Sequence, residues 1–335
     1  MGNKTMYDEL AEAIGVQGSK ILPKLFEMLA TEDEARVLLA ASPAKSVAEL
    51  ATKTGLAADA IEKMMDPLFK KGLIYKSSKP GAPRYYRVRS LLQFHDATIL
   101  AIGAPADFID MWKRYHEEEF HEHQKQIEQA LPRPAVRVIP VNSAVTADTA
   151  VAPFEDIQQI VEKADHLAVT NCTCKVVTGA PCGTSVEVCI QVNRAAEYAL
   201  ERGTGKALTK DETLELLKKC QEEGLVHVVG NSRGLGHIIC NCCDDCCINW
   251  TGSRKAGAKF TAPSRFAAVI DPELCTECGT CLDRCFFDAI DLDGDPSAID
   301  EEECMGCGLC VATCPVEAIS LKEVREEAYV PEPAR

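Results

Sequence analysis

The stretch CTECGTCLDRC at residues 275–285 recurs 29 residues later as CMGCGLCVATC at residues 304–314. Both copies have the spacing C-x-x-C-x-x-C-x-x-x-C, in which three thiolates surround one cubane and the fourth binds the cluster of the other repeat. This predicts two [4Fe–4S] clusters, one bound by Cys275, Cys278, Cys281 and Cys314 and the other by Cys304, Cys307, Cys310 and Cys285. Because the ligands cross between the repeats, cluster binding and folding should be one event.

The residues around the cysteines repeat at the same offset, as in the pairs Ile270/Ile299, Ala289/Ala318 and Leu292/Leu321. Each half therefore predicts a strand, a cluster loop, a short helix and a strand. Over residues 268–322 the chain resembles the bacterial two-cluster ferredoxins. Phe286 stands where that family usually has proline, so we expect altered packing around Cys285 but no lost ligand. The alternative, two zinc knuckles, is disfavoured because zinc sites rarely use an overlapping four-cysteine run.

Length and cysteine usage favour a cytoplasmic metalloprotein. The chain has 335 residues, 46% of them apolar, which is enough for two or three domains with hydrophobic cores. Its 18 cysteines are clustered, and the N-terminus lacks the apolar run of a secretory signal, so metal binding is favoured over disulfides. We expect no membrane insertion, and a location in the cytoplasm of an anaerobe that keeps exposed clusters intact.

The net charge of −15 is concentrated at one end of the chain. Residues 269–335 contain 17 acidic and 4 basic residues, whereas residues 1–90 contain 11 acidic and 14 basic residues. A strongly acidic cluster-bearing surface would attract a redox partner with a basic docking surface and would repel nucleic acid.

The N-terminal pattern resembles a winged-helix domain of bacterial transcription regulators. Thr31 caps one helix that has an acidic first turn, and a capping box at Ser46 begins a second. A third helix carries an apolar face from Ile61 to Phe69, and Gly72 ends it. Two short strands, 73–75 and 85–88, follow around the turn 79–83. The predicted fold is thus α+β and multidomain: a winged-helix-like domain (1–90), a helical connector (91–140), a mixed α/β cysteine-rich domain (141–267), a ferredoxin-like ββα repeat (268–322) and an acidic tail (323–335).

DNA binding by this domain is the less favoured interpretation. The hairpin offers cations for phosphate contacts at Lys76, Lys79, Arg84, Arg87 and Arg89. However, the outward face of the third helix carries Asp59, Glu62 and Asp66, and Pro67 is expected to interrupt the helix. An interaction or dimerisation platform, and hence a possible homo-oligomer, is therefore preferred.

The segment between residues 91 and 135 is expected to be helical. Its run of His116, His121 and His123 among acidic residues permits a metal site, but His116 and His121 do not share a helix face, so a solvated face is the preferred interpretation. Pro132, Pro134 and Pro140 then indicate a linker.

The central segment contains nine further candidate ligands. A buried strand, 166–170, leads to the first cysteines, a helix is expected to run from Cys189 to about Arg202, and a second apolar strand, 225–229, leads to the rest. Cys220, on the apolar face of a helix, is interpreted as an ordinary buried thiol. Thiolates placed so closely repel one another unless a metal centre offsets the charge, so we expect metal at Cys172, Cys174, Cys182, Cys189, Cys240, Cys242, Cys243, Cys246 and Cys247.

The grouping of these nine cysteines stays open. We hypothesise that the 172–189 group meets the 240–247 group at one site: eight ligands would hold two cubanes, and four or five would hold one cluster and leave spare thiols. Zinc at part of this segment is the alternative. The run N-C-x-C-K at 171–175, followed by C-N-C-C at 240–243, resembles a group of large ferredoxin-like iron–sulfur proteins of anaerobic bacteria and archaea. Lys175 and Asp244-Asp245 depart from that pattern.

These features favour an electron carrier, or an oxidoreductase subunit, over a stand-alone enzyme. The glycine-bearing stretches 203–206 and 230–236 lack nucleotide-binding fingerprints and are expected to be turns, and no catalytic residue can be named. The protein is expected to relay single electrons to or from a partner oxidoreductase through its ferredoxin module and its central centre or centres. The alternatives are a redox-responsive transcription regulator and a reductase with a catalytic central cluster.

Overall fold

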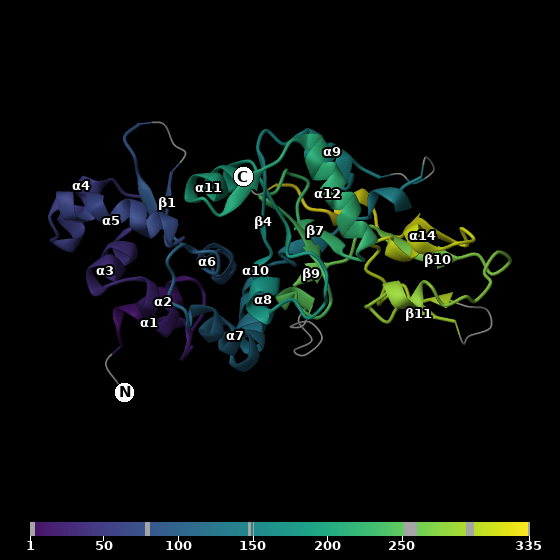
Figure 1. Cartoon of the computed structure of the whole chain (residues 1–335), viewed down its shortest axis with the longest axis horizontal. Coiled ribbons are helices and arrows are strands. Elements are labelled where there is room, and N and C mark those ends of the chain that lie inside the picture. The colour runs from purple at the N-terminus through teal and green to yellow at the C-terminus, as the bar shows by residue number, and fades with distance from the viewer. Residues whose placement is uncertain are drawn as a thin grey trace. The chain divides into compact units, whose positions relative to one another are not determined.

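The protein is a mixed α+β structure with several sheets, seen in a computed structural model that describes residues 4–77, 81–146, 149, 151–250, 260–292 and 298–333. The chain divides into two units. In Figure 1 the ribbon is coloured by residue number, from purple at the N-terminus to yellow at the C-terminus. The first unit comprises Met1–Ala130 and Thr173–Gly179, and the second comprises Leu131–Cys172 and Ala180–Arg335. The domain boundaries expected from the sequence stay predictions.

The first unit is helical apart from one hairpin. Its elements are α1 (Met6–Ala13), α2 (Leu22–Leu29), α3 (Glu32–Ala40), α4 (Val47–Thr54), α5 (Ala58–Lys70), β1 (Ile74–Lys76), β2 (Tyr85–Arg87), α6 (Leu91–Thr98), α7 (Phe108–Glu118), α8 (Phe120–Ala130) and α10 (Thr173–Thr178). Strands β1 and β2 pair antiparallel, with Tyr75 opposite Tyr86. The order of three helices and a hairpin agrees with the expected pattern, but the winged-helix assignment itself stays a prediction.

Local signals set several of the helix ends in this unit. The cap expected at Thr31 and the capping box expected at Ser46 are present, and both are capping boxes that satisfy backbone N–H groups at the start of the helix. Gly72, at φ +79°, follows the end of α5. The expected interruption at Pro67 was wrong, because α5 continues through it to Lys70. Pro67 lies in the last turn, so the helix loses only one backbone hydrogen bond there.

The basic side chains of the hairpin bind within their own unit. Arg84 donates to the carbonyl of Ala44 and forms a 3.0 Å ion pair with Glu49. Arg87 donates to the carbonyl of Ala13. These groups are therefore engaged by the protein itself, whereas Lys79 lies outside the described residues.

The expected solvated histidine face of α7 and α8 was wrong. His116 stacks on His95 with ring centroids 5.0 Å apart, beside the fully buried Trp112, and His123 lies 3.0 Å from the hydroxyl of Tyr115. Burial lowers the pKa of His116 to about 2. The histidines thus form part of an aromatic core, because α6, α7 and α8 bring their rings together from different turns.

The second unit is built on a seven-stranded sheet of order β6-β4-β5-β8-β7-β3-β9. The strands pair antiparallel except β3 with β9. Their bounds, with those of the helices and the short 3-10 turn of this region, are β3 (Val136–Val138), η1 (Asn142–Ala144), α9 (Ile157–Glu162), β4 (Leu167–Asn171), β5 (Glu187–Val192), α11 (Arg194–Arg202), β6 (Gly205–Ala207), α12 (Lys210–Glu222), β7 (Val226–Gly230), β8 (Ile238–Cys242) and β9 (Thr261–Ala262).

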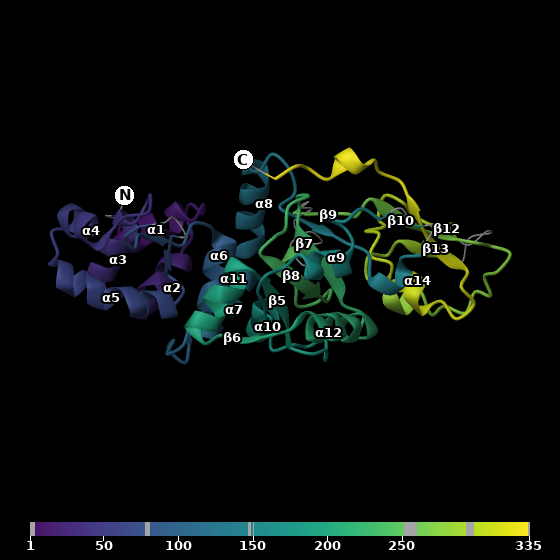
Figure 2. The same ribbon diagram turned by 90° about the horizontal axis from the view of Figure 1, so that it is seen from above.

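The two faces of this sheet have different coverings. Residues such as Ile190, Val229 and Ile239 face a core shared with α9 and α12, which lie side by side in Figures 1 and 2. Their strand neighbours Val228 and Cys242 face a second core that includes residues of the repeat region. Because side chains alternate along a strand, the cysteines of β8 at positions 240 and 242 share one face.

The repeat region pairs its first and last strands and its two middle strands. Its elements are β10 (Phe266–Ile270), η2 (Leu282–Arg284), β11 (Ile290–Asp291), β12 (Ala298–Ile299), α14 (Leu309–Thr313) and β13 (Ile319–Glu323). Strand β10 pairs with β13 and β11 with β12, both antiparallel. Positive φ angles recur at the offset of the sequence repeat, at 277/306, 279/308 and 288/317. The backbone therefore repeats as the sequence does.

The segment expected as an acidic tail docks against the second unit as far as residue 333. After β13 it forms η3 (Glu327–Tyr329), and Val330 is 1% exposed. Arg233 binds this segment through the carbonyl of Val330 and an ion pair with Glu327. Over the described ranges, no helix is both long and apolar enough to cross a membrane.

Candidate metal centres

The first cysteine site lies in the outer part of the repeat region. A cavity of about 330 Å³ is lined by Cys275, Cys278, Cys281 and Cys314. Three of these come from the loop after β10, and Cys314 follows α14. Backbone N–H groups point at the sulfurs: Ala318 donates to Cys314 Sγ at 3.3 Å and Glu277 to Cys275 Sγ at 3.5 Å. Such N–H···S bonds stabilise thiolates and help to set cluster potentials.

The second cysteine site is the counterpart of the first and is more deeply buried. A cavity of about 340 Å³ is lined by Cys285, Cys304, Cys307 and Cys310. Burial raises the pKa of Cys307 to about 12 and also raises that of Cys310. Thiolates in such a place need a cation to hold them ionised, so the donor set and the shared cavity fit a thiolate-bound cluster.

A third group joins five cysteines on the cysteine-bearing face of the large sheet. Cys189 contacts Cys172 and Cys240, and Cys242 contacts Cys240 and Cys247. Contacts with the neighbouring thiols, together with burial, raise the pKa values of Cys189 and Cys242 well above the ordinary thiol value. Five sulfurs linked by successive contacts therefore need a metal centre to become thiolates together.

Strand register explains how the third group forms. The helix expected to begin at Cys189 was wrong there: Cys189 lies in β5, and α11 begins only at Arg194. Valine and isoleucine alternate with polar residues around it, which is typical of a strand. Ile190 pairs with Ile239, so extending the register by one residue sets Cys189 opposite Cys240.

A fourth group contains three cysteines and one carboxylate. The ligand atoms of Cys182, Cys243, Asp245 and Cys246 all lie within 4.8 Å of one another. The Sγ atoms of Cys246 and Cys182 are 3.6 Å apart, and Cys246 Sγ lies 3.3 Å from Asp245 Oδ1. Burial raises the pKa of Cys182, but hydrogen bonds from Thr184 outweigh it, so the net shift is downward.

The nine central cysteines thus do not gather at the one shared site that was hypothesised. They divide into the five-cysteine group, the group with Asp245, and Cys174. Chain neighbours separate: Cys242 and Cys247 belong to the five-cysteine group, whereas Cys243 and Cys246 belong to the group with Asp245. Cys174 lies on α10 in the first unit. Cys220 is fully buried in α12 beside Leu217, as expected of an ordinary core thiol.

One hydrophobic cluster joins the five-cysteine group to the second cysteine site. Cys242 and Cys247 belong to it, with Trp250 buried among them, and Cys240 and Cys307 pack against it. The rings of Phe286 and Phe287 lie 6.1 and 5.2 Å from that of Trp250. Phe286, which stands in place of the usual proline, therefore packs toward the central cysteines.

Two parts of these sites were not identified from the sequence. Asp245 was noted only as a departure from a family pattern, although an acid enclosed by Cys243 and Cys246 was the available signal. No sequence pattern indicated that Trp250 belongs to a site, because its contact with Phe286 joins parts of the chain that are distant in sequence.

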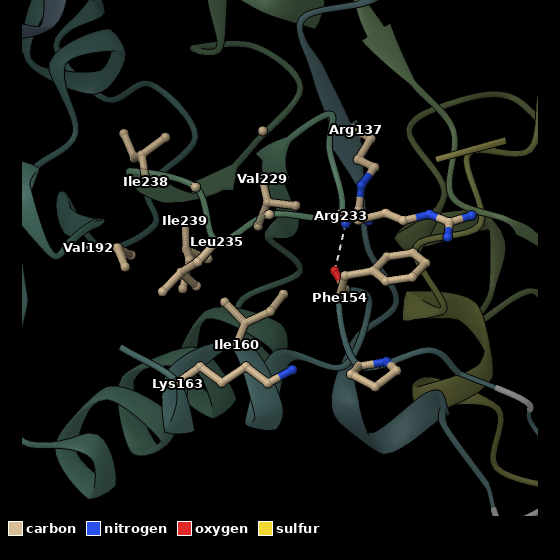
Figure 3. Close-up of a pocket in the computed structure, with 14 residues that line it drawn as sticks. Arg137, Phe154, Ile160, Lys163, Val192, Val229, Arg233, Leu235, Ile238 and Ile239 are labelled. Atoms are coloured by element: carbon tan, nitrogen blue, oxygen red, sulfur yellow. Dashed lines mark hydrogen bonds between the residues drawn. The ribbon is translucent and has the colours of Figure 1, made fainter. Parts of the chain in front are cut away.

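A pocket of about 430 Å³ lies on the helix-covered face of the large sheet (Figure 3). Arg137, only 1% exposed, reaches from β3 and donates to the carbonyl of Phe154 at 2.6 Å. The stretch 230–236 lines this pocket as the connection between β7 and β8, in agreement with the expected turn. The stretch 203–206 was only partly a turn, because Gly205 begins β6.

Comparison with known proteins identifies the repeat region. Residues 268–321 match the family described as 4Fe-4S dicluster domain. No match was found among curated proteins or among solved structures. This match and the cysteine groups described above together indicate that the chain is an iron–sulfur protein that contains a 4Fe-4S dicluster domain.

Proposed function

We propose that the protein passes single electrons between its iron–sulfur clusters and a partner oxidoreductase. The supporting observation is the shared hydrophobic cluster, which contains Cys242 of the five-cysteine group and against which Cys307 of the second cysteine site packs. Each bound cluster supplies one-electron redox chemistry. The role of the chain is to hold the clusters at neighbouring places and to exclude water between them, for which Trp250 and Phe287 are suitably placed.

The ligand assignment follows the cavities. Cys275, Cys278, Cys281 and Cys314 would hold one [4Fe–4S] cluster, and Cys285, Cys304, Cys307 and Cys310 the other. The five-cysteine group would hold a further iron–sulfur cluster through four of its thiols, with one thiol to spare. Cys278 is exposed, so the first cysteine site is the proposed point of electron entry or exit.

The surface beside the first cysteine site suits a protein partner. Leu274, Leu282 and Val316 are 52%, 45% and 39% exposed there, and Val316 also lines the cavity. Exposed acids, including Glu273 and Glu277, are interspersed with them. Exposed apolar side chains with acidic residues among them fit a partner whose docking surface combines apolar and basic residues.

Iron and sulfide analysis of anaerobically purified full-length protein tests the relay. A dicluster domain alone accounts for about eight irons, and a central cluster would raise the count to about twelve. The double variant Cys189→Ser/Cys240→Ser leaves the five-cysteine group only three thiols, so it should remove about four irons, and Cys220→Ser, which changes a core thiol outside the groups, should remove none. A wild-type count of about eight, unaffected by the double variant, would refute the central cluster. Electron paramagnetic resonance of the reduced protein should also show coupled centres.

Charge reversal tests the docking surface. Glu273→Lys beside the first cysteine site should slow electron transfer to a basic one-electron acceptor protein several-fold at low salt, and the difference should fade at high salt. Glu215→Lys makes the same charge change on the exposed side of α12 and serves as the control. Equal effects of the two variants would show that only net charge matters and would remove the case for this surface.

A further inference from the structure

The group of Cys182, Cys243, Cys246 and Asp245 differs in geometry from the other cysteine groups. Four candidate ligand atoms lie mutually within 4.8 Å, and two of the sulfurs are 3.6 Å apart. Zn–S bonds of about 2.3 Å place the sulfurs of a tetrahedral site about 3.8 Å apart. In a cubane each thiolate binds a different iron at the periphery of the cluster, so four ligand atoms cannot all lie this close together. The five-cysteine group differs, because its sulfurs contact one another in succession and, among the described residues, no three of its ligand atoms lie mutually within 4.8 Å.

The local structure supplies these ligands from two distant loops. Cys243, Asp245 and Cys246 come from the turn that follows β8, and Cys182 comes from the loop before β5, 64 residues from Cys246. The loop of Cys182 is itself anchored, because Ser185 donates from both its backbone and its hydroxyl to the carboxylate of Glu223. The loop of Cys182 is therefore held in place by contacts that do not involve an ion.

We propose that Cys182, Cys243, Cys246 and Asp245 bind one tetrahedral zinc ion, separate from the iron–sulfur clusters. Three thiolates and one carboxylate in a four-coordinate arrangement suit Zn²⁺, which accepts sulfur and oxygen ligands and imposes no geometric preference of its own. The sulfurs of Cys243 and Cys246 are buried and the carboxylate of Asp245 is exposed, so the ion is held at the protein surface.

The proposed ion would act as a cross-link. The turn from 243 to 246 lies between Cys242 and Cys247, both members of the five-cysteine group. Tying that turn to the loop of Cys182 fixes the positions from which those two sulfurs project. This inference does not depend on electron transfer, because the geometry of the four ligands stands whatever the other cysteines bind.

Metal analysis of the full-length protein, purified without oxygen, provides the test. We expect one zinc per chain in addition to the iron. Asp245→Asn should weaken zinc affinity by about tenfold or more, measured by competition with a chelator, whereas Asp244→Asn, a neighbouring acid outside the ligand set, should not. Cys246→Ser should lose zinc and retain the iron of the dicluster domain. Cobalt exchanged into the site should give the visible bands of a tetrahedral thiolate complex, and Asp245→Asn should shift them.

Three outcomes would overturn the proposal. The first is a chain without zinc in which Cys246→Ser removes about four irons, since the group would then hold a cubane. The second is equal zinc affinity in Asp245→Asn and Asp244→Asn. The third is zinc retained undiminished by Cys246→Ser. If instead zinc binds as expected and the iron is missing, the proposed electron transfer fails while the zinc site stands.

Discussion

Gly308 and Gly279 occupy equivalent places in the two cysteine loops of the repeat region and allow a matched comparison. Their φ angles are +76° and +78°. Alanine in this left-handed region costs about 1–2 kcal/mol at either place. The backbone penalty is therefore nearly the same in Gly308→Ala and Gly279→Ala, and the difference between the variants reports packing alone.

The surroundings of the two glycines differ sharply. A Cβ on Gly308 would lie 2.5 Å from Ala144 Cβ in η1, whereas a Cβ on Gly279 would meet nothing within 4 Å. Non-bonded carbons prefer about 3.5–4.0 Å, and Ala144 cannot rotate its methyl group away. The loop of Cys307 must then move from η1, to which it is joined by a 2.9 Å hydrogen bond from Val141 N–H to the Cys307 carbonyl. Overpacking of this kind costs about 1–3 kcal/mol.

We expect Gly308→Ala to be less stable than Gly279→Ala by about 1–3 kcal/mol. Denaturant titration of the two anaerobic holoproteins, followed by loss of visible cluster absorption, measures this as a lower midpoint for Gly308→Ala. The second cysteine site should also release iron to a chelator faster in that variant. Equal midpoints and equal iron release would refute the assignment of tight packing between this loop and η1.

Two further predictions concern buried charge. Glu155→Gln should destabilise the second unit by about 1–3 kcal/mol, because the buried Arg265 loses its 2.8 Å ion pair with Glu155 while it keeps the 2.7 Å ion pair with Glu323. The same change at the exposed Glu162, which pairs with Lys210, should cost under about 1 kcal/mol. Lowering the pH from 7 to 5 should cost the first unit about 2 kcal/mol through His116, because the unfolded imidazole gains a proton near pH 6.5 while its folded pKa is about 2.

Denaturant titrations test both predictions. For the buried ion pair, the unfolding midpoints of Glu155→Gln and Glu162→Gln are compared, and similar losses of stability in the two variants would contradict a special role for the pair of Glu155 and Arg265. A second titration follows Trp112 fluorescence at pH 7 and pH 5 in wild type and His116→Phe. The stability contribution of a neutral buried histidine is complete above its unfolded pKa and declines below it, so the variant should show a smaller loss on acidification. An equal loss in both proteins would place the pH dependence elsewhere.

The sequence alone determined the features that depend on short-range spacing. The cysteine run at 275–285 and its copy place thiolates on tight loops, and the fold gathers Cys314 with the first run and Cys285 with the second, as the spacing predicts. The capping boxes at Thr31 and Ser46 bond within four residues, so no distant contact is needed to form them. Capping of this kind depends on residues within one turn of the helix, so the sequence alone can predict it.

Only the tertiary structure decided how the central cysteines are grouped. Cys242 and Cys243 are chain neighbours, but they join different groups because the strand ends there and the turn directs the second sulfur to the loop of Cys182. The alternation around Cys189 already indicates a strand, but the position of Cys189 opposite Cys240 depends on the pairing of β5 with β8. His116 is buried by rings from other helices. Each outcome depends on segments far apart in sequence, and the residue pattern of one segment does not specify which other segments will pack against it.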